Sequence, residues 1–391
     1  MHQFIYPTKD TYISNNRVER LVNFGSNQTL AIDCTYIHNS VEISEKTIRR
    51  SLLKFDLTEI SKSLAQANIN DVNFSLSLKA TDFYNVPVAY TIYVYPISQS
   101  WEQGKGMYAY DGDSGGVNWL YRNYPDLSSS WYPTMSLGTA TSDYLTTPSS
   151  ESFMNGGGTW FYLSPSSCSS SFFIINSGSS LICSQSFDYQ TGDINVDVTK
   201  ICKSWICGII PNDGFILLSS TELLPSSADG GEMQFFSKDT NTIYSPIIRV
   251  KYDDSSYITG SFAPVTSSAG VFVSVNNIKS IYKVGSVVRF DVYARDLYPS
   301  KNFNRLQDVY LTPKLLTSRS YYSVIDNDKG EVVIPFDDYT KISSDSNRGN
   351  YFVLNTTGFQ PERYYRILIK TIHSDGTIEI FDNNNVFKLE R

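Results

Sequence analysis

Apolar and polar residues alternate along many short segments of the chain. Residues 74–80 alternate cleanly, and residues 90–97 alternate with so small a difference in polarity that both faces of that segment are expected to be covered. Because successive side chains of a strand point to opposite faces of a sheet, both segments predict strands. Residues 51–57 and 214–218 have the denser apolar content of central strands. With Gly, Asn and Ser turn clusters between the strands, the pattern predicts an all-β sandwich or barrel.

Two segments carry helix signals. In residues 197–208, Asp197 or Thr199 is placed to cap the first turn, apolar residues recur four positions apart, and a glycine follows the last turn. Trp205 on this segment is expected to be a core residue. Residues 59–67 carry a weaker signal, with their apolar residues on one face. We therefore expect two short helices in an otherwise β fold.

Residues 105 to 190 differ from the rest of the chain. They combine Ser-rich and Gly-rich stretches with Trp119, Trp131 and Trp160. A disordered segment would not carry so many aromatic residues, so we expect long ordered loops inserted in a sandwich. Loops on a β scaffold are where binding is concentrated, and the three tryptophans are the candidates for contact with a glycan or a partner protein. The alternative is that they anchor the loops to the core.

The composition changes near residues 253–256, where acidic and serine residues cluster. After a Ser-rich passage, strand patterns resume at residue 271 and recur to residue 389. Five or more strands in about 120 residues fit an immunoglobulin-like sandwich, here without cysteines for an inter-sheet disulfide. The predicted domains are therefore residues 1–254, with an insert at about 105–190, and residues 255–391.

Length, charge and cysteine content narrow the classes of protein. The 391 residues suggest two domains at roughly 150 residues each. A formal net charge of −7 opposes nucleic-acid binding, and no apolar run approaches the roughly 18 residues of a membrane span. The first residues show no signal-peptide pattern. Five irregularly spaced cysteines do not form a disulfide framework, so reduced thiols are expected.

Signatures of catalysis are sparse. None of His2, His38 and His373 stands in a metalloprotease or zinc-finger spacing. The chain also lacks the nucleophile-elbow, P-loop and dinucleotide-binding motifs. We therefore expect no catalytic residues, no metal ligands and no cofactor.

Several acidic residues remain candidates for the carboxylate pair of a glycosidase or for a Ca²⁺ site. Aspartates at strand ends most often form turns, and no loop completes the spacing of an EF-hand, so solvated turns are the favoured interpretation. The residues in question are Glu102, Asp111, Asp113, Asp193, Asp337 and Asp338 for a carboxylate pair, and residues 111–116 and 326–328 for calcium.

The first 254 residues carry a series of short motifs in a defined order. They are YPTKDTYI at 6–13, NFGS at 23–26, RSLLKFDL at 50–57, SWEQG at 100–104, VDVT at 196–199 and PNDGF at 211–215. Together these motifs resemble the DNRLRE family of β-sandwich domains, which are similar to carbohydrate-binding modules and occur on bacterial surface proteins. The resemblance implies a jelly-roll sandwich for residues 1–254, from which the long insert is a departure.

A second resemblance covers the junction and the C-terminal part. Its motifs are FFSKDTNTIYSP at 235–246, VKYDD at 250–254, EVVIPFDD at 331–338, GNYF at 349–352 and QPERYY at 360–365. As a set they resemble uncharacterised virion structural proteins of tailed bacteriophages with the same two-part layout. The resemblance implies a location in a virion rather than a mechanism.

These observations favour a non-enzymatic structural subunit of a tailed-phage virion, in the tail, baseplate or neck region. Such a subunit is made in the cytoplasm of the bacterial host, needs no export signal, and is expected to be oligomeric and to bind other virion proteins. The alternative is a carbohydrate-binding adhesin that contacts host surface glycans. A polysaccharide-cleaving enzyme is the third hypothesis and needs a suitably spaced acid pair.

Overall fold

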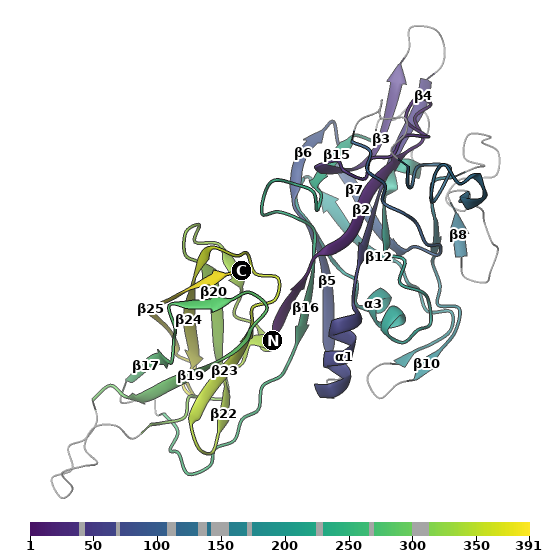
Figure 1. The fold of residues 1–391 in the computed structure, drawn as a ribbon. Coiled ribbons are helices and arrows are strands. Elements are labelled where there is room, and N and C mark those ends of the chain that lie inside the picture. The colour runs from purple at the N-terminus through teal and green to yellow at the C-terminus, as the bar shows by residue number, and fades with distance from the viewer. Residues whose placement is uncertain are drawn as a thin grey trace, which may run out of the picture. The chain divides into compact units, whose positions relative to one another are not determined.

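The structure, a computed structural model, describes residues 1–38, 44–67, 71–107, 115–131, 139–141, 156–169, 174–223, 230–265, 270–298 and 313–391. The described part of the chain is nearly all β with little helix, and its sheets are built mainly from antiparallel pairs (Figure 1). The predicted all-β sandwich class is confirmed.

The chain divides into two compact units. The N-terminal unit is Ile5–Arg249, and the C-terminal unit contains Val250–Arg391 together with Met1–Phe4. The boundary predicted from composition lies between residues 254 and 255. Strands β1 (His2–Ile5) and β16 (Ile247–Tyr252) each contain a boundary between the two units.

The largest sheet among the described residues has eight antiparallel strands and lies in the N-terminal unit. Strand β14 is buried along its whole length and lies between β7 and β4, so the central position predicted for residues 214–218 is confirmed. The strands in sheet order are β12 (Cys183–Asp188), β7 (Ala89–Pro96), β14 (Phe215–Ser219), β4 (Ser44–Phe55), β3 (Thr29–His38), β15 (Glu232–Phe236) and β6 (Ala80–Tyr84), with β2 (Pro7–Ser14) paired to β4.

A second sheet of this unit contains β5 (Val72–Leu78) and β13 (Ile194–Asp197), which pair antiparallel. Every second residue of β5 is buried, as the alternation in the sequence predicted. The short elements of the inserted region are η1 (Leu127–Ser129), β8 (Thr139–Thr141), β9 (Thr159–Phe161), β10 (Cys168–Ser169) and β11 (Ile174–Ile175); η3 (Ser220–Leu223) follows β14.

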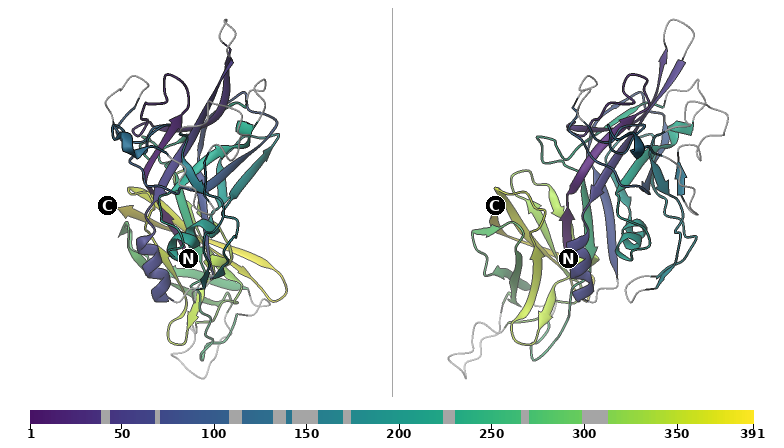
Figure 2. Two further views of the ribbon diagram at one scale, coloured as in Figure 1. Left: turned by 90° about the vertical axis from the view of Figure 1, so that its right-hand side faces the viewer. Right: turned by 45° about the vertical axis from the view of Figure 1, so that its right-hand side comes forward.

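Both predicted helices form, as α1 (Thr58–Ala67) and α3 (Thr199–Ile206), and they lie side by side in the N-terminal unit (Figures 1 and 2). The side chain of Asp197 accepts the amide hydrogen of Thr199, the first residue of α3, whereas the N-cap residue is Val198 and forms no side-chain capping hydrogen bond. Helix α3 ends before Gly208, whose φ of 69° is the left-handed conformation that favours glycine.

The C-terminal unit is a sandwich of a four-stranded and a five-stranded sheet. Aromatic side chains join the two layers: the rings of Tyr322 and Phe352 stack with centroids 4.3 Å apart, and those of Phe290 and Phe387 lie 5.8 Å apart. The sheet orders are β17 (Val271–Asn276), β19 (Val287–Asp296), β23 (Gly349–Asn355), β22 (Ser343–Asp345), and β18 (Ile281–Lys283), β25 (Ile378–Glu390), β24 (Arg363–Ile372), β20 (Ser320–Asp326), β21 (Val332–Ile334). The jelly-roll and immunoglobulin-like topologies remain predictions.

The first residues of the chain are part of the C-terminal unit. The ring of Phe4 packs edge-on against Phe359 with centroids 5.5 Å apart, and Nε2 of the buried His2 lies 3.0 Å from the Asp337 carboxylate. Burial lowers the pKa of His2 despite this carboxylate. Asp337 also caps η5 (Asp338–Thr340), so it has a structural role.

Candidate functional site

The three tryptophans predicted as contact residues lie inside the N-terminal unit. Trp119, Trp131 and Trp160 are 2%, 3% and 1% exposed. They belong to one core cluster with main-sheet residues Ile13, Cys34, Ile48, Leu52, Ile216 and Leu218, and with Ile97 and Trp101, which follow β7.

The buried Arg50 side chain lies in this cluster and contacts its tryptophans. Its guanidinium carbon lies 5.0 Å from the ring centre of Trp119 and 5.5 Å from that of Trp160, within the distance of a cation–π interaction. It also donates to the Glu222 carboxylate and, at 2.6 Å, to the carbonyl oxygen of Gly157. One buried cation therefore joins the β4 strand, η3 and the inserted loop.

The inserted loop approaches this cluster so closely that glycine is required. Gly156 has a φ of 117°, and a Cβ at this position would lie 2.2 Å from the carbonyl oxygen of Trp119. The same carbonyl accepts the amide hydrogen of Gly157 at 2.7 Å. The glycine run thus fits the loop backbone against the tryptophans.

Anchoring is therefore the role that the geometry gives to the three tryptophans. A ring that stacks on a sugar needs an exposed face, and these faces are covered by the core. Contact with a glycan or a partner stays a prediction, which would require the cluster to open.

A small hollow lies between the two helices. It has a volume of about 280 Å³, and Trp205, expected to be a core residue, forms one wall of it while its ring also packs on Phe215. The indole nitrogen of Trp205 and the side-chain oxygen of Asn212 have no hydrogen-bond partner among the described residues. The other residues that line the hollow are Leu57, Thr58, Ser61, Lys62 and Ile206.

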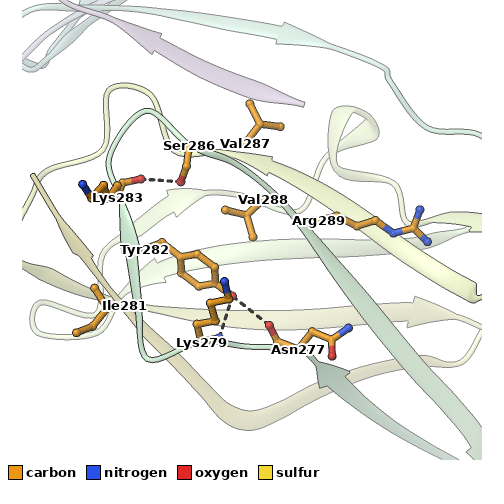
Figure 3. A pocket seen from close by; sticks show the side chains of 9 residues that line it. All are labelled: Asn277, Lys279, Ile281, Tyr282, Lys283, Ser286, Val287, Val288 and Arg289. Atoms are coloured by element: carbon orange, nitrogen blue, oxygen red, sulfur yellow. Dashed lines mark hydrogen bonds between the residues drawn. The ribbon is translucent and has the colours of Figure 1, made fainter.

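A larger hollow, which we call the basic hollow, lies in the C-terminal unit (Figure 3). Its volume is about 600 Å³, and Figure 3 shows the Tyr282 ring between the side chains that line it. The Tyr282 hydroxyl accepts the amide hydrogen of Lys279 and donates to the carbonyl of Asn277, which holds the ring in place. The lining residues are Asn277, Lys279, Ile281, Tyr282, Lys283, Ser286, Val287, Val288 and Arg289.

Charge in the basic hollow comes from three cations. Arg289 is paired with Asp291 and Asp345 and stacks over the Tyr351 ring. Lys279 and Lys283 are exposed, and within the described part of the chain neither forms an ion pair. The hollow therefore offers an apolar surface bordered by two unpaired ammonium groups.

An exposed aromatic feature, which we call the knob, lies where β12 ends and β7 begins. It consists of Val88, Asp188 and Tyr189. Tyr189 is 87% exposed with a φ of 52°, and its amide donates to the Val88 carbonyl at 2.8 Å. Asp188 is exposed and has no cationic partner among the residues described.

Acidic residues elsewhere are structural in their placement. Asp326 accepts the amide hydrogens of Asp328 and Lys329, so the 326–328 loop forms the favoured turn. Asp326 is buried and pairs with Arg363, so it is not solvated as expected. Within the described ranges no three potential ligands gather as a metal site. Glu102 pairs with Lys9 and Asp193 with Lys79; Asp111 and Asp113 lie outside the described residues.

Two buried aspartates of the N-terminal unit have raised pKa values. Burial raises the pKa of Asp10 to about 7, although its carboxylate accepts the amide hydrogen of Lys238 at 2.6 Å. Burial likewise raises the pKa of Asp33 to about 7 against the opposing charge of Arg49, 3.0 Å away. Both groups are enclosed by the fold, so they act on stability.

All five cysteines are free thiols, as predicted. Burial raises the pKa of Cys34 and Cys183 to about 12, so neither is an activated nucleophile.

Neither helix of the described chain has the length and apolar content to cross a membrane. Comparison with protein-family models and with curated proteins finds no match to this chain.

Proposed function

We propose that the chain is a structural subunit of a tailed-bacteriophage virion, in the tail, baseplate or neck region, and that it acts through protein–protein interfaces rather than by catalysis. The location rests on the resemblance of the junction and C-terminal motifs to virion structural proteins. The interface role rests on exposed apolar side chains of the C-terminal unit.

An apolar stripe on β25 is the observation that carries the proposal. Ile378 and Ile380 are 60% and 58% exposed. Ile378 pairs with Ile372 of β24, and paired residues of neighbouring strands lie on the same face of a sheet. Beside Ile380 in the register is Lys370, whose ammonium lies over the rings of Tyr321 and Phe336.

Burial of this stripe against another protein is favourable. Each Å² of apolar surface removed from water contributes roughly 25 cal/mol. Two isoleucines on one face, flanked by aromatic rings and a cation, are typical of the core of an interface with a polar rim.

Incorporation of variants into particles tests the proposal. The double variant Ile378→Asp, Ile380→Asp adds charge to the stripe without touching the core, and Ser374→Asp adds a charge in the exposed turn before β25 as a control. We expect both proteins to fold, the control to enter particles at the wild-type level and the double variant to be depleted from them. Equal incorporation of all three would contradict the interface.

A second candidate function, contact with host glycans, is favoured by the hollow between α1 and α3. It combines the hydroxyls of Thr58 and Ser61 and the side chain of Asn212 with the Trp205 ring, which is only 7% exposed, so hydrogen bonds rather than ring stacking would hold a sugar there. A glycan array with the wild type and Ser61→Trp, which fills the hollow, tests it, with Lys200→Ala on the surface of α3 as the control. Signals lost in Ser61→Trp alone would support glycan binding, and a flat array for the wild type would refute it.

A further inference from the structure

The first four residues of the chain, which we call the N-terminal segment, are bound in the C-terminal unit by polar contacts as well as by packing. Met1–Phe4 belong to this unit, and the chain enters the N-terminal unit at Ile5. The amide of Tyr252 donates to the Met1 carbonyl at 3.1 Å, and the Met1 ammonium lies 2.9 Å from Asp254. The side chain of His2 is 0% exposed. The segment is therefore an integral part of the C-terminal unit.

The ring of His2 has one partnered nitrogen and one without a partner. Nε2 lies 3.0 Å and 3.1 Å from the two carboxylate oxygens of Asp337, whereas the buried Nδ1 has no hydrogen-bond partner among the described residues. An ionised carboxylate only accepts hydrogen bonds, so Nε2 carries the hydrogen of the neutral ring and donates it to Asp337. Nδ1 then carries no hydrogen, and the neutral ring fits the site.

Protonation of His2 would not fit the site. It places a second hydrogen on Nδ1, and no acceptor for it is present within the described part of the chain. A buried donor without an acceptor, on a ring that has gained a positive charge, loses its hydration without replacement. Water supplies both the acceptor and the hydration once the N-terminal segment leaves the unit.

The groups that face His2 act in both directions on its charge. Burial lowers the pKa of His2, the Asp337 carboxylate opposes this effect, and the Met1 ammonium and Lys251 of β16 add to it. The Tyr339 ring of η5 packs edge-on, with ring centroids 6.4 Å apart. The bound segment therefore takes up its proton less readily than the released one. The stability that His2 contributes is present above the reference pKa of 6.5 and is lost as pH falls.

The partner carboxylate is not the group that takes up the proton first. Burial opposes the ionisation of Asp337, but hydrogen bonds from His2 and from the Tyr339 amide lower its pKa below the ordinary 3.8. The Asp337 side chain also caps η5. Asp337 therefore stays ionised and in place while His2 gains its proton.

We propose that the N-terminal segment is released by acid: protonation of His2 expels Met1–Phe4 from the C-terminal unit, and return to neutral pH restores them. The C-terminal unit is built from two stretches of chain, residues 1–4 and 250–391, so release removes one of the two. A buried histidine beside a carboxylate is a chemical basis for such a switch between pH 5 and 8. The inference goes beyond the virion role and does not depend on it.

Two measurements on the purified full chain, over a series from about pH 8 to about pH 4, test the release. The chain has three histidines, so isotope-labelled histidine gives three ring signals in an NMR spectrum, and His2→Gln assigns that of His2. Hydrogen exchange of residues 2–5, corrected for the intrinsic effect of pH, reports release. We expect one midpoint below 6.5 for both measurements, with protection of residues 2–5 lost across it and that of β24 kept.

Two variants separate His2 from other groups that titrate in acid. His2→Gln keeps a donor for Asp337 and gains no proton in this range, so its N-terminal segment should stay protected at every pH. His373→Gln is the matched control. His373 is also buried in the C-terminal unit, with Nε2 3.1 Å from the Glu379 carboxylate, and its replacement should leave release at the wild-type pH.

Three results would overturn the proposal. They are wild-type protection that persists after the His2 signal has titrated, release of the segment in His2→Gln at the wild-type pH, and loss of protection in β24 together with residues 2–5. If glutamine cannot replace the ring and the segment of His2→Gln is unprotected at every pH, the two wild-type midpoints decide: one midpoint supports the proposal, and separate midpoints overturn it.

Discussion

Arg50 and Glu222 form an ion pair in the core of the N-terminal unit, with Nη2 and Oε2 2.6 Å apart and side chains 1% and 3% exposed. The pair joins residues 172 positions apart in the chain. Its cation also lies beside two tryptophans of the insert, so the pair couples the sheet to the inserted loops.

Removal of one partner from this pair should strongly destabilise the fold. Glu222→Leu leaves the guanidinium buried without its carboxylate, and we expect the free energy of unfolding to fall by about 3–5 kcal/mol. Glu102→Leu breaks the exposed pair with Lys9 and should cost about 1 kcal/mol or less. Urea denaturation of both variants measures the difference, and equal losses would contradict the buried pair's role.

Gly156 should tolerate a methyl group far less well than Gly178. Alanine at residue 178 meets nothing within 4 Å and has only the cost of a left-handed conformation, about 1–2 kcal/mol. Alanine at residue 156 has that cost and also a backbone clash with the Trp119 carbonyl. Thermal unfolding should show a clearly larger loss for Gly156→Ala; similar losses would mean that the loop does not press on Trp119.

The stability of the N-terminal unit should depend on the protonation of Asp10. Its pKa is about 7 in the fold and 3.8 as the reference value, so the folded state binds more protons between these values. Stability from this group is therefore present at low pH and is lost as pH rises towards 7. Asp10→Asn keeps an acceptor for the Lys238 amide without the charge. In urea denaturation, the free energy of unfolding of Asp10→Asn should match that of the wild type near pH 4 and exceed it at pH 8.

Asp56→Asn is the control with the opposite sign. Hydrogen bonds from Thr58 lower the pKa of Asp56, so its contribution is present above the reference pKa and is lost as pH falls. Asp56→Asn should be less stable than the wild type at neutral pH, and this difference in stability should disappear in acid.

For Asp10, the contradicting result is a wild type more stable than Asp10→Asn at pH 8, which would show that the buried carboxylate is ionised without cost.

Replacement of an insert tryptophan by alanine should destabilise the fold, because these rings are packed in the core. Trp160→Ala removes a buried ring beside Tyr95 and Arg50 and should lower the free energy of unfolding by about 3–5 kcal/mol. Denaturation of the variant measures this loss. A stable Trp160→Ala protein that has lost glycan binding would instead support the contact role.

Local patterns in the sequence predicted where strands and helices form better than they predicted which residues these elements contact. The alternation in residues 74–80 and the dense apolar run at 214–218 indicated β5 and the central strand β14. Within a strand, the pattern of apolar and polar residues shows whether one face or both faces are buried. Residues 197–208 likewise indicated α3.

Long-range pairing set the limits of prediction. The Trp119 ring contacts Arg50, which pairs with Glu222, and the sequence around residue 119 indicates neither partner. The placement of Met1–Phe4 in the C-terminal unit depends on residues such as Phe359 and Asp337, more than 300 positions away. The knob and the basic hollow could not be predicted, because the periodicity of the sequence does not show which turn residues are exposed.

The central claim is that this chain is a structural part of a virion. The most direct test bands particles from the producing culture on a density gradient and measures this chain against the major capsid protein by quantitative mass spectrometry. We expect the chain to band with the particles at a fixed ratio that does not change on a second gradient. Its absence from the particle band, with recovery in the cell envelope or the medium, would contradict the claim.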